Sequence, residues 1–349
     1  MKIESKNAFL VTNPSNVKYL TGFKGSNGQV LFTKSKKYFL TDARYIQFLK
    51  SLDKNFDGII YSDFLKTITK ILKKHKTNML QLEGNHITYN QFQKIKSDLK
   101  PIKIIPNIMS IEKVRQVKKT HEIKLLQKAQ QINEIVFKKV VKDLKNGITE
   151  IQIAETIKEL AKKEGADDIS FEPIAAFGEN SANPHHENTK RKLKKGDVVL
   201  IDMGMKYKEY CSDMTRTLFT AKPNAKQKEV YNVVLQAQLA AEKALKAGKK
   251  GAEVDKTART IMKDFQYEQF FTHSLGHGIG IDVHESPALS TKNDLPIPEN
   301  AVVTIEPGIY LQKLFGVRIE DMVLVKRQKN INLTKVPKDI ESLILNISN

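Results

Sequence analysis

Two similar segments, about a hundred residues apart, constrain this fold more than any other feature of the chain. The first, 198–204, reads Val-Val-Leu-Ile-Asp-Met-Gly, and the second, 302–308, reads Val-Val-Thr-Ile-Glu-Pro-Gly. Strand-forming residues thus precede an acidic residue in both segments, Asp202 in one and Glu306 in the other. The repeat predicts two similar strands, one in each half of an internally duplicated domain.

A second acidic residue follows each segment, within a further run of strand-forming residues. Asp213 lies 11 residues after Asp202, and Glu320 lies 14 residues after Glu306. If each pair of runs forms an antiparallel hairpin, its two acids lie opposite each other on one face, with Cβ atoms about 5 Å apart. We expect the hairpins to turn at 207–209 and at 312–314.

These paired carboxylates need a positive partner. Like charges that face each other across a ladder destabilise it, and buried ionised carboxylates are costly unless they are paired or bind a cation. One such pair alone could be structural and matched by Arg216 or Arg318. Two pairs at matched positions of a repeat favour an internal metal site.

A histidine-rich segment between the hairpins supplies candidate nitrogen ligands. Three of the eight histidines, His273, His277 and His284, fall within twelve residues, among closely spaced glycines that allow close approach of the backbone. We expect only one or two of these side chains to bind metal. Oxygen donors with one or two imidazoles suit Mn, Co or Zn, whereas Ca and Mg sites rarely include histidine.

Four sequence blocks carry a family resemblance. They resemble the signature blocks of the pita-bread metallopeptidases of family M24, in the branch of Xaa-Pro aminopeptidase and prolidase, and they span 202–217, 273–285, 304–310 and 316–321. The resemblance implies two divalent metal ions per chain, most simply Mn with Co or Zn as alternatives. It implies five ligands, two of them (Asp213 and Glu320) bridging: Asp202, Asp213, His277, Glu306 and Glu320.

The resemblance also implies roles for side chains that face the substrate. His185, His273 and His284 match substrate-facing histidines of the family, and His185 and His284 are expected to assist the tetrahedral intermediate and proton transfer. Arg318 is expected to orient the last bridging glutamate or the scissile region. His186 is expected to be a solvated neighbour.

The domain organisation follows from the same resemblance and from local patterns. Residues 13–23 and 40–45 are similar to the amino-terminal domain of this branch, and two prolines near 101–106 precede a helical stretch. We predict an α/β (α+β) chain with a creatinase-like mixed α/β domain over 1–110 and a pita-bread domain with an internal pseudo-two-fold over 111–349. Its helices are expected at 111–144, 150–163, 226–246 and 254–265, with a capping box at Thr149 and Gln152 in the second.

The implied function is hydrolysis of the Xaa-Pro bond at the N-terminus of peptides by a hydroxide held between two metals. Prolidase is the alternative, because the two activities differ in what caps the site beyond the proline. A non-enzymatic peptide binder or a metal-free creatinase would not need all five ligands. A cysteine hydrolase using Cys211 is disfavoured, because a neighbouring anion raises the pKa of a thiol and a strand position favours burial.

Composition limits the remaining classes. The net charge is +19, but lysines are spread along the chain in short doublets and no nucleic-acid-binding motif occurs, so we expect a solvated basic surface and no nucleic-acid partner. The N-terminal residues are polar and no run approaches 18 apolar residues, which predicts a cytoplasmic protein with no membrane partner. The single cysteine excludes an intrachain disulfide. We expect proline-containing peptides as partners and a homodimer or larger homo-oligomer.

Overall fold

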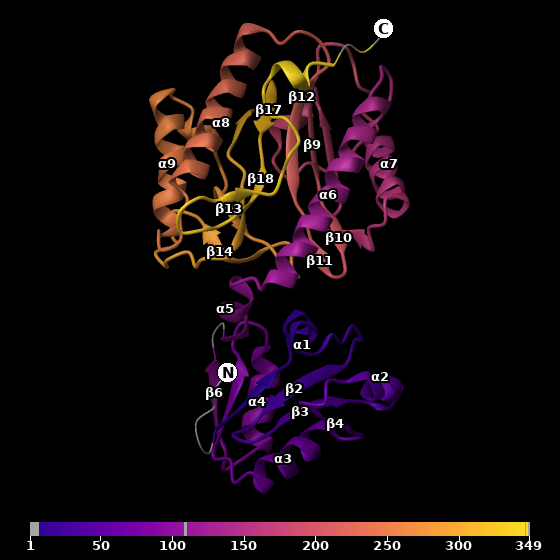
Figure 1. Cartoon of the computed structure of the whole chain (residues 1–349), viewed down its shortest axis with the longest axis vertical. Helices are drawn as coiled ribbons and strands as arrows, with labels where there is room; N and C mark the ends of the chain where they lie inside the picture. The colour runs from indigo at the N-terminus through magenta and orange to yellow at the C-terminus, as the bar shows by residue number, and fades with distance from the viewer. Residues whose placement is uncertain (1–6, 108–109, 346, 348–349) are drawn as a thin grey trace. The chain divides into compact units, whose positions relative to one another are not determined.

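The computed structural model describes residues 7–107, 110–345 and 347, and the chain divides into two compact units at Arg115 and Gln116 (Figure 1). Helix α5 (Ser110–Gln116) runs across the division that the sequence placed between residues 110 and 111. The units are described separately. No helix among the described residues is both long enough and apolar enough to cross a membrane. The cytoplasmic location stays a prediction.

The first unit is a six-stranded mixed sheet with the strand order β4-β3-β2-β1-β5-β6. Alternate residues of β1 enter two separate cores: Ala8 and Leu10 pack in one, Phe9 and Val11 in the other. Both faces of the sheet are therefore covered by helices. The strands are β1 (Asn7–Val11), β2 (Gly28–Phe32), β3 (Lys37–Thr41), β4 (Asp57–Ile60), β5 (Met79–Glu83) and β6 (Lys103–Asn107), and the other helices are α1 (Pro14–Thr21), α2 (Ile46–Ser51), α3 (Phe64–Lys74) and α4 (Tyr89–Asp98).

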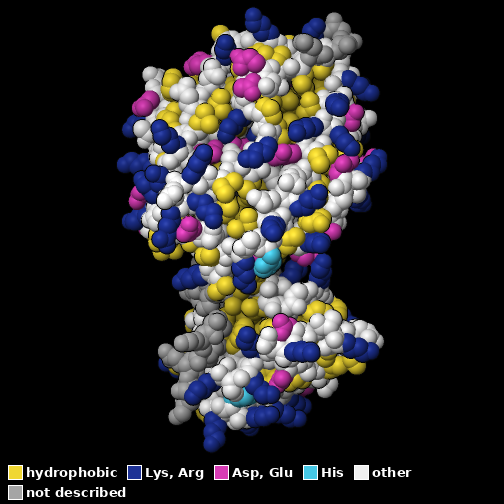
Figure 2. All heavy atoms as spheres, in the orientation of Figure 1, with side chains coloured by type: hydrophobic (Ala, Val, Ile, Leu, Met, Phe, Trp, Pro, Cys, Tyr) yellow, Lys and Arg dark blue, Asp and Glu magenta, His cyan; other side chains and the backbone are white. Residues whose placement is uncertain are grey.

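The second unit repeats one order of elements, two helices followed by strands. Figure 1 shows α6 (Thr120–Asp143) and α7 (Glu150–Lys163) on one side of the strands, and α8 (Ala225–Ala244) and α9 (Gly251–Asp264) on the other. The predicted capping box of α7 is confirmed, since Thr149 and Gln152 bond reciprocally. Figure 2 shows basic side chains scattered over the visible face of this unit, with acidic and apolar side chains between them.

One helix prediction is wrong. The expected continuous helix over 111–144 is broken between α5 and α6. Glu122, in the first turn of α6, accepts the backbone N–H of Lys119 at 2.9 Å and so caps a new helix start, while the N–H of Lys118 donates to Asn300 O at 2.9 Å. These hydrogen bonds of the two backbone N–H groups hold the chain extended at Lys119. The spacing of apolar residues does not indicate such a break.

The strands of the second unit form the two predicted hairpins. In the first half they are ordered β12-β9-β8 and β11-β10-β7, and in the second β14-β13-β15-β18-β19, with β16 and β17 paired beside them. The strands are β7 (Asp168–Ile169), β8 (Ile174–Phe177), β9 (Val198–Met203), β10 (Met205–Tyr207), β11 (Tyr210–Cys211), β12 (Met214–Phe219), β13 (Gly276–Gly278), β14 (Glu285–Leu289), β15 (Val302–Ile305), β16 (Gly308–Leu311), β17 (Phe315–Arg318), β18 (Asp321–Leu324) and β19 (Ile331–Asn332).

The register of the two hairpins decides where the acids lie. In the second hairpin Ile305 pairs with Asp321 and Gly308 with Arg318, so Glu306 and Glu320 face each other as predicted. In the first hairpin Asp202 pairs with Thr215, two residues beyond the predicted partner, which makes Asp213 a diagonal neighbour on the same face.

The first turn explains this shift. The chain reverses at Lys208 and Glu209, which both have positive φ, and Tyr207 pairs with Tyr210. Two residues with positive φ are typical of a two-residue hairpin turn, and such turns usually contain glycine or asparagine. Because neither occurs here, the sequence did not mark the position of this turn.

Candidate active site

The four predicted carboxylates lie where strands end or ladders are interrupted. Asp202 is on β9, Asp213 lies between β11 and β12, and Glu306 and Glu320 lie between the β15–β18 and β16–β17 ladders. The two hairpins are joined directly: Glu320 N–H donates to Thr215 O at 3.1 Å, and Thr215 Oγ1 donates to Glu320 Oε2 at 2.7 Å. The acids of both halves therefore meet in one place.

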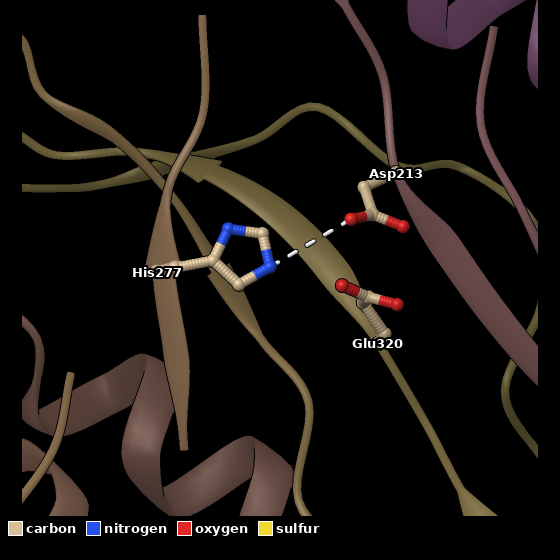
Figure 3. A group of neighbouring side chains, drawn as sticks. All are labelled: Asp213, His277 and Glu320. Atoms are coloured by element: carbon tan, nitrogen blue, oxygen red, sulfur yellow. Dashed lines mark ion pairs between the residues drawn. The ribbon is translucent and has the colours of Figure 1, made fainter. Parts of the chain in front are cut away.

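His277 completes this group from β13. Its neighbour Gly276 lies so close to β15 that a Cβ there would be 2.1 Å from Thr304 O, and Thr304 Oγ1 accepts the His277 N–H at 3.0 Å. Ligand atoms of Asp213, His277 and Glu320 lie within 4.8 Å of one another, and Figure 3 shows the imidazole pointing toward both carboxylates. Close backbone approach at a glycine thus places the imidazole.

The contacts of the imidazole fix which nitrogen faces the acids. Nδ1 lies 3.1 Å from Gly278 O and donates to it, because a carbonyl only accepts. Nε2 lies 3.2 Å from Glu306 Oε1 and 3.7 Å from Asp213 Oδ2. Burial lowers the pKa of His277, but the hydrogen bond and charge of Glu306 outweigh it and raise the pKa. A divalent cation would take the place of this Nε2 proton.

The carboxylates perturb one another. Burial raises the pKa of Asp213 and of Glu320 well above the usual range, and neighbouring carboxylates add to the effect. Burial also raises the pKa of Asp202, against the charge of Arg318. Glu306 is the exception: burial opposes its ionisation, but the hydrogen bond and charge of His277 lower its pKa to about 2. Ionising all four carboxylates together therefore requires further positive charge in the group.

Two buried oxygens test whether a metal fits here. Among the described residues, no hydrogen-bond donor reaches Asp202 Oδ1 or Glu320 Oε1. Buried oxygens without donors are costly, so their occurrence in this cluster fits residues that bind a cation. Four carboxylates and one imidazole are a donor set suited to Mn, Co or Zn.

Arg318 supplies positive charge at one edge of this group. Its Nη2 donates to Asp202 Oδ2 at 2.6 Å, and its Nη1 donates to Tyr310 Oη at 2.8 Å and to Pro184 O at 3.2 Å. It reaches Glu320 only through Thr215, whose Oγ1 accepts from Arg318 Nε at 3.0 Å. One arginine therefore offsets part of the charge of four carboxylates.

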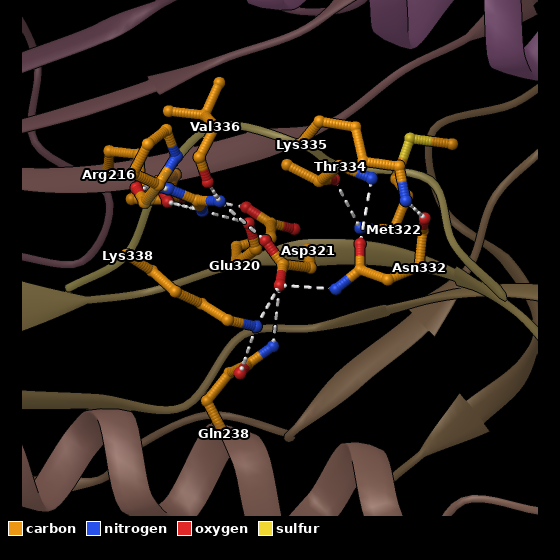
Figure 4. Close-up of polar contacts among 12 residues, drawn as sticks. Arg216, Gln238, Glu320, Asp321, Met322, Asn332, Thr334, Lys335, Val336 and Lys338 are labelled. Atoms are coloured by element: carbon orange, nitrogen blue, oxygen red, sulfur yellow. Dashed lines mark hydrogen bonds and ion pairs between the residues drawn. The ribbon is translucent and has the colours of Figure 1, made fainter. Parts of the chain in front are cut away.

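Arg216 lies behind the site and serves a different acid. Its Nη2 donates to Asp321 Oδ1 at 2.7 Å, and its Nη1 donates to the backbone oxygen of Glu320 at 2.7 Å (Figure 4). Lys338 Nζ also contacts Asp321, at 2.5 Å, and both Arg216 and Asp321 are fully buried. Arg216 therefore anchors the backbone of a predicted ligand and does not neutralise the ligand carboxylates.

Tyr310 is a site residue that sequence reasoning did not single out, although it ends one of the signature blocks. His273 Nδ1 lies 2.8 Å from Ser274 O and must donate to it, so Nε2 accepts from Tyr310 Oη at 2.8 Å. Arg318 thus donates to Tyr310, and Tyr310 donates to His273. Burial raises the pKa of Tyr310 to about 12 and lowers that of His273, so both stay neutral at pH 7.

The cluster opens into a pocket of about 590 Å³. His185, His273 and His284 all line it, together with the five predicted ligands and Arg318. The ring of His284 lies 4.4 Å from that of His277, and partial burial together with the charge of His277 lowers the pKa of His284. The substrate-facing histidines of the prediction therefore share one pocket with the carboxylates.

Two other predicted side chains lie outside this chemistry. The expectation that His186 is a solvated neighbour is wrong, because its Nε2 bonds to Glu150 Oε2 at 2.8 Å and its side chain is 9% exposed. Cys211 is buried, its Sγ contacts Ile281 O at 3.4 Å, and burial raises the pKa of the thiol to about 11. A thiol with this pKa is an inert, packed group at neutral pH.

Comparison with known proteins agrees with this geometry. The chain belongs to metallopeptidase family M24, whose sequence model matches residues 124–327, and the creatinase/prolidase N-terminal domain matches residues 1–117. The predicted fold class and the prediction of an enzyme are thereby confirmed.

Relatives match over nearly their whole length. An uncharacterized peptidase of Bacillus subtilis, YqhT, is 36% identical over 95% of this chain and 94% of its own. The solved Xaa-Pro dipeptidase from Bacillus anthracis superposes with a TM-score of 0.92 at 35% identity, covering 97% of this chain and 94% of that one. An X-Pro aminopeptidase from Thermotoga maritima gives 0.87 at 37% identity, covering 95% and 96%.

Proposed function

We propose that this enzyme is an Xaa-Pro aminopeptidase that uses two divalent metal ions, with Mn as the best candidate and Co or Zn as alternatives. The observation that carries the proposal is the meeting of four carboxylates with His277 at one end of a pocket, where two carboxylate oxygens have no donor among the described residues. The ligands would be Asp202, Asp213, His277, Glu306 and Glu320. Assembly as a homodimer or larger oligomer stays a prediction.

The bound ions would lower the pKa of a shared water and polarise the scissile carbonyl. The chain's own residues then have three tasks. Arg318 holds Asp202 in place, and Thr215 holds Glu320 through a 2.7 Å bond. His185 and His284 line the pocket and can donate an N–H to a developing oxyanion.

Release of the proline sets a further requirement. The leaving nitrogen of an Xaa-Pro bond, like that of any peptide bond, must receive a proton as the bond breaks. A neutral imidazole in the pocket can supply it if the other nitrogen is reprotonated from solvent. The lowered pKa of His284 keeps its imidazole neutral at pH 7, with one N–H available for hydrogen bonding. We assign this proton transfer to His284 or His185.

The charges that line the pocket support aminopeptidase activity over prolidase activity. A dipeptide substrate carries a free carboxylate directly after the proline, and burying it requires a cation. Arg318 is the one lysine or arginine among the described residues lining the pocket, and it is already bonded to Asp202. Burial lowers the pKa of both His273 and His284, so neither offers a cation at pH 7.

Prolidase remains the second candidate, favoured by the superposition on a structure described as an Xaa-Pro dipeptidase. The two activities are separated by comparing kcat/KM for an Xaa-Pro dipeptide and an Xaa-Pro-Yaa tripeptide with added Mn²⁺, with Xaa-Ala-Yaa as the control. We expect the tripeptide to be preferred at least about tenfold, which corresponds to about 1.4 kcal/mol. Preference for the dipeptide would establish prolidase, and no cleavage with Mn, Co or Zn would refute both.

A matched pair of variants sharpens this comparison. Ala288 lies on β14 and lines the pocket, so Ala288→Arg adds a cation there, whereas Ala288→Leu adds bulk without charge. We expect Ala288→Arg to shift the preference toward the dipeptide and Ala288→Leu not to do so. Equal shifts in both variants would show that pocket charge does not set the preference.

A further inference from the structure

Glu150 is a buried carboxylate that the reaction outlined above does not use. It is the first residue of α7, and it has no exposed surface. Burying an ionised carboxylate is costly unless several donors satisfy it. Glu150 is satisfied by one segment, 177–189, which begins at the end of β8 and contributes Pro184 and His185 to the pocket. We call residues 178–189 the His185 loop.

Each carboxylate oxygen of Glu150 holds a different end of this loop. Oε1 accepts from Phe177 N–H at 2.8 Å and from Asn180 Nδ2 at 2.9 Å. Oε2 accepts from Thr189 N–H at 2.9 Å, from Thr189 Oγ1 at 2.6 Å and from His186 Nε2 at 2.8 Å. One side chain therefore holds the loop with four hydrogen bonds and the last residue of β8 with a fifth.

His185 lies between these two anchored ends. The preceding residue, Pro184, accepts a hydrogen bond from Arg318 Nη1 at 3.2 Å, so the loop is also held from the side of the predicted ligands. The loop begins at Gly178, whose φ of +51° would be strained in other residues. Three fixed points thus surround His185, which lines the pocket of the predicted ligands and faces substrate in the proposed function.

The other half of the repeat contains a similar arrangement. Asp255 on α9 is also fully buried, and its Oδ1 accepts from Leu275 N–H at 3.0 Å. Its Oδ2 bonds Arg259 Nε at 2.7 Å, and Arg259 Nη2 donates to His273 O at 2.6 Å. In both halves, the second helix carries a buried carboxylate that holds a backbone segment bearing a pocket histidine.

We propose that Glu150 is a positioning residue that sets the place of His185 in the pocket, with His186 completing the set of donors. This inference rests on the proposed peptidase function. A displacement of about 1 Å in a group that assists the reaction can cost about 10²-fold in rate. Glu150→Gln leaves only one carbonyl oxygen, so one end of the loop loses its acceptor and faces an amide NH₂ instead.

A double-mutant cycle with Mn-loaded full-length enzyme tests the inference. The variants are Glu150→Gln, His185→Ala and their combination, and the matched control is Glu159→Gln, an exposed residue on the same helix. We expect Glu150→Gln to lower kcat on an Xaa-Pro-Yaa peptide about 10- to 100-fold with unchanged metal content. In the His185→Ala background the same change should cost less than about twofold, because its target is already gone.

Several results would overturn the inference. An equal loss from Glu150→Gln in both backgrounds, or loss of metal, would show that Glu150 does not act through His185. If Glu150→Gln does not fold, His186→Leu and His186→Gln replace it in the cycle. His186→Leu removes a donor to Glu150 and should lower kcat. His186→Gln keeps a donor, so its kcat should stay closer to that of the wild type. Equal activity of these two would refute the role of His186.

The failure of the proposed function is distinguishable from the failure of this inference. A metal-loaded wild type that does not cleave the peptide refutes the function. The loop is then followed by NMR of ring-labelled histidine in the Zn-loaded chain, because Zn²⁺ is diamagnetic and does not broaden nearby signals as Mn²⁺ does. We expect the His185 signal, assigned by its loss in His185→Ala, to move in Glu150→Gln and not in Glu159→Gln. An unmoved signal would overturn the inference.

Discussion

Replacing Glu320 by Gln should stabilise the metal-free protein while it weakens metal binding, because Glu320 is one of the two predicted bridging ligands. The Gln carbonyl can keep the 2.7 Å bond from Thr215 Oγ1. Its NH₂ then takes the place of Oε1, the oxygen that no described donor reaches, and points toward the other carboxylates. The substitution removes one repelling charge and adds one donor.

The magnitude follows from the geometry. Ligand atoms of Asp213 and Glu320 lie within 4.8 Å, and two unit charges at that distance repel by about 3 kcal/mol at an effective dielectric constant of about 20. The raised pKa of both groups means that partial protonation already relieves some of this cost. We therefore expect a gain of about 1 to 3 kcal/mol, or roughly 2 to 10 °C in Tm for a unit of this size.

The gain should depend on pH with a defined sign. Because the pKa of Asp213 and of Glu320 is raised on folding, the folded chain holds protons that the unfolded chain releases. The metal-free wild type therefore loses stability as pH rises from about 4, the unfolded value, through the raised pKa. The advantage of Glu320→Gln should be small at pH 4 and larger at pH 8.

Thermal unfolding in excess chelator, with Glu159→Gln as a surface control for loss of one charge, measures this effect. Adding Mn²⁺ should reverse the order, because only the wild type gains stability from full metal binding. A chelated Glu320→Gln protein that melts below the chelated wild type would refute the reasoning, since it would show that the carboxylates do not repel one another in the empty site.

Three further predictions follow from the contacts of the site. Iodoacetamide should leave activity unchanged, because burial raises the pKa of Cys211 to about 11, and inactivation matched by alkylation of this thiol would contradict the account. His277→Ala should lower metal content and rate together, whereas His284→Ala should keep both ions and lose about 10²- to 10³-fold in kcat, so metal analysis that finds the opposite would exchange their roles. Asp321→Ala should destabilise the fold by about 3 to 5 kcal/mol by leaving Arg216 buried without its acid, and denaturant unfolding that shows a loss of less than about 1 kcal/mol would contradict this account of the pair.

Local sequence patterns predicted three of the helices and both hairpins, because the residues that form each pattern lie within a few positions of one another. The spacing of apolar residues predicted helices close to α7, α8 and α9, and runs of strand-forming residues predicted both hairpins. The register of the second hairpin was correct because its three-residue turn at 312–314 is flanked by regular ladders. The first was misplaced by two residues, since Lys208 and Glu209 adopt positive φ without a glycine to mark the turn.

The parts that sequence reasoning missed depend on distant contacts. His186 meets Glu150 across 36 positions, and Tyr310 meets His273 across 37. Nothing in the spacing of either pair indicates that contact, because it depends on how α7 and the hairpins pack together. The carboxylates could be recognised because each half of the internal repeat contains a pair of them. The contacts of His186 with Glu150 and of Tyr310 with His273 are found only in the folded structure.

Titrating chelated wild-type protein with Mn²⁺, while bound metal and hydrolysis of an Xaa-Pro-Yaa peptide are measured together, tests the central claim most directly. The account predicts no activity without metal and a rate that reaches its maximum as two ions bind per chain. Full activity in verified metal-free protein, or two bound ions per chain with no hydrolysis, would contradict it.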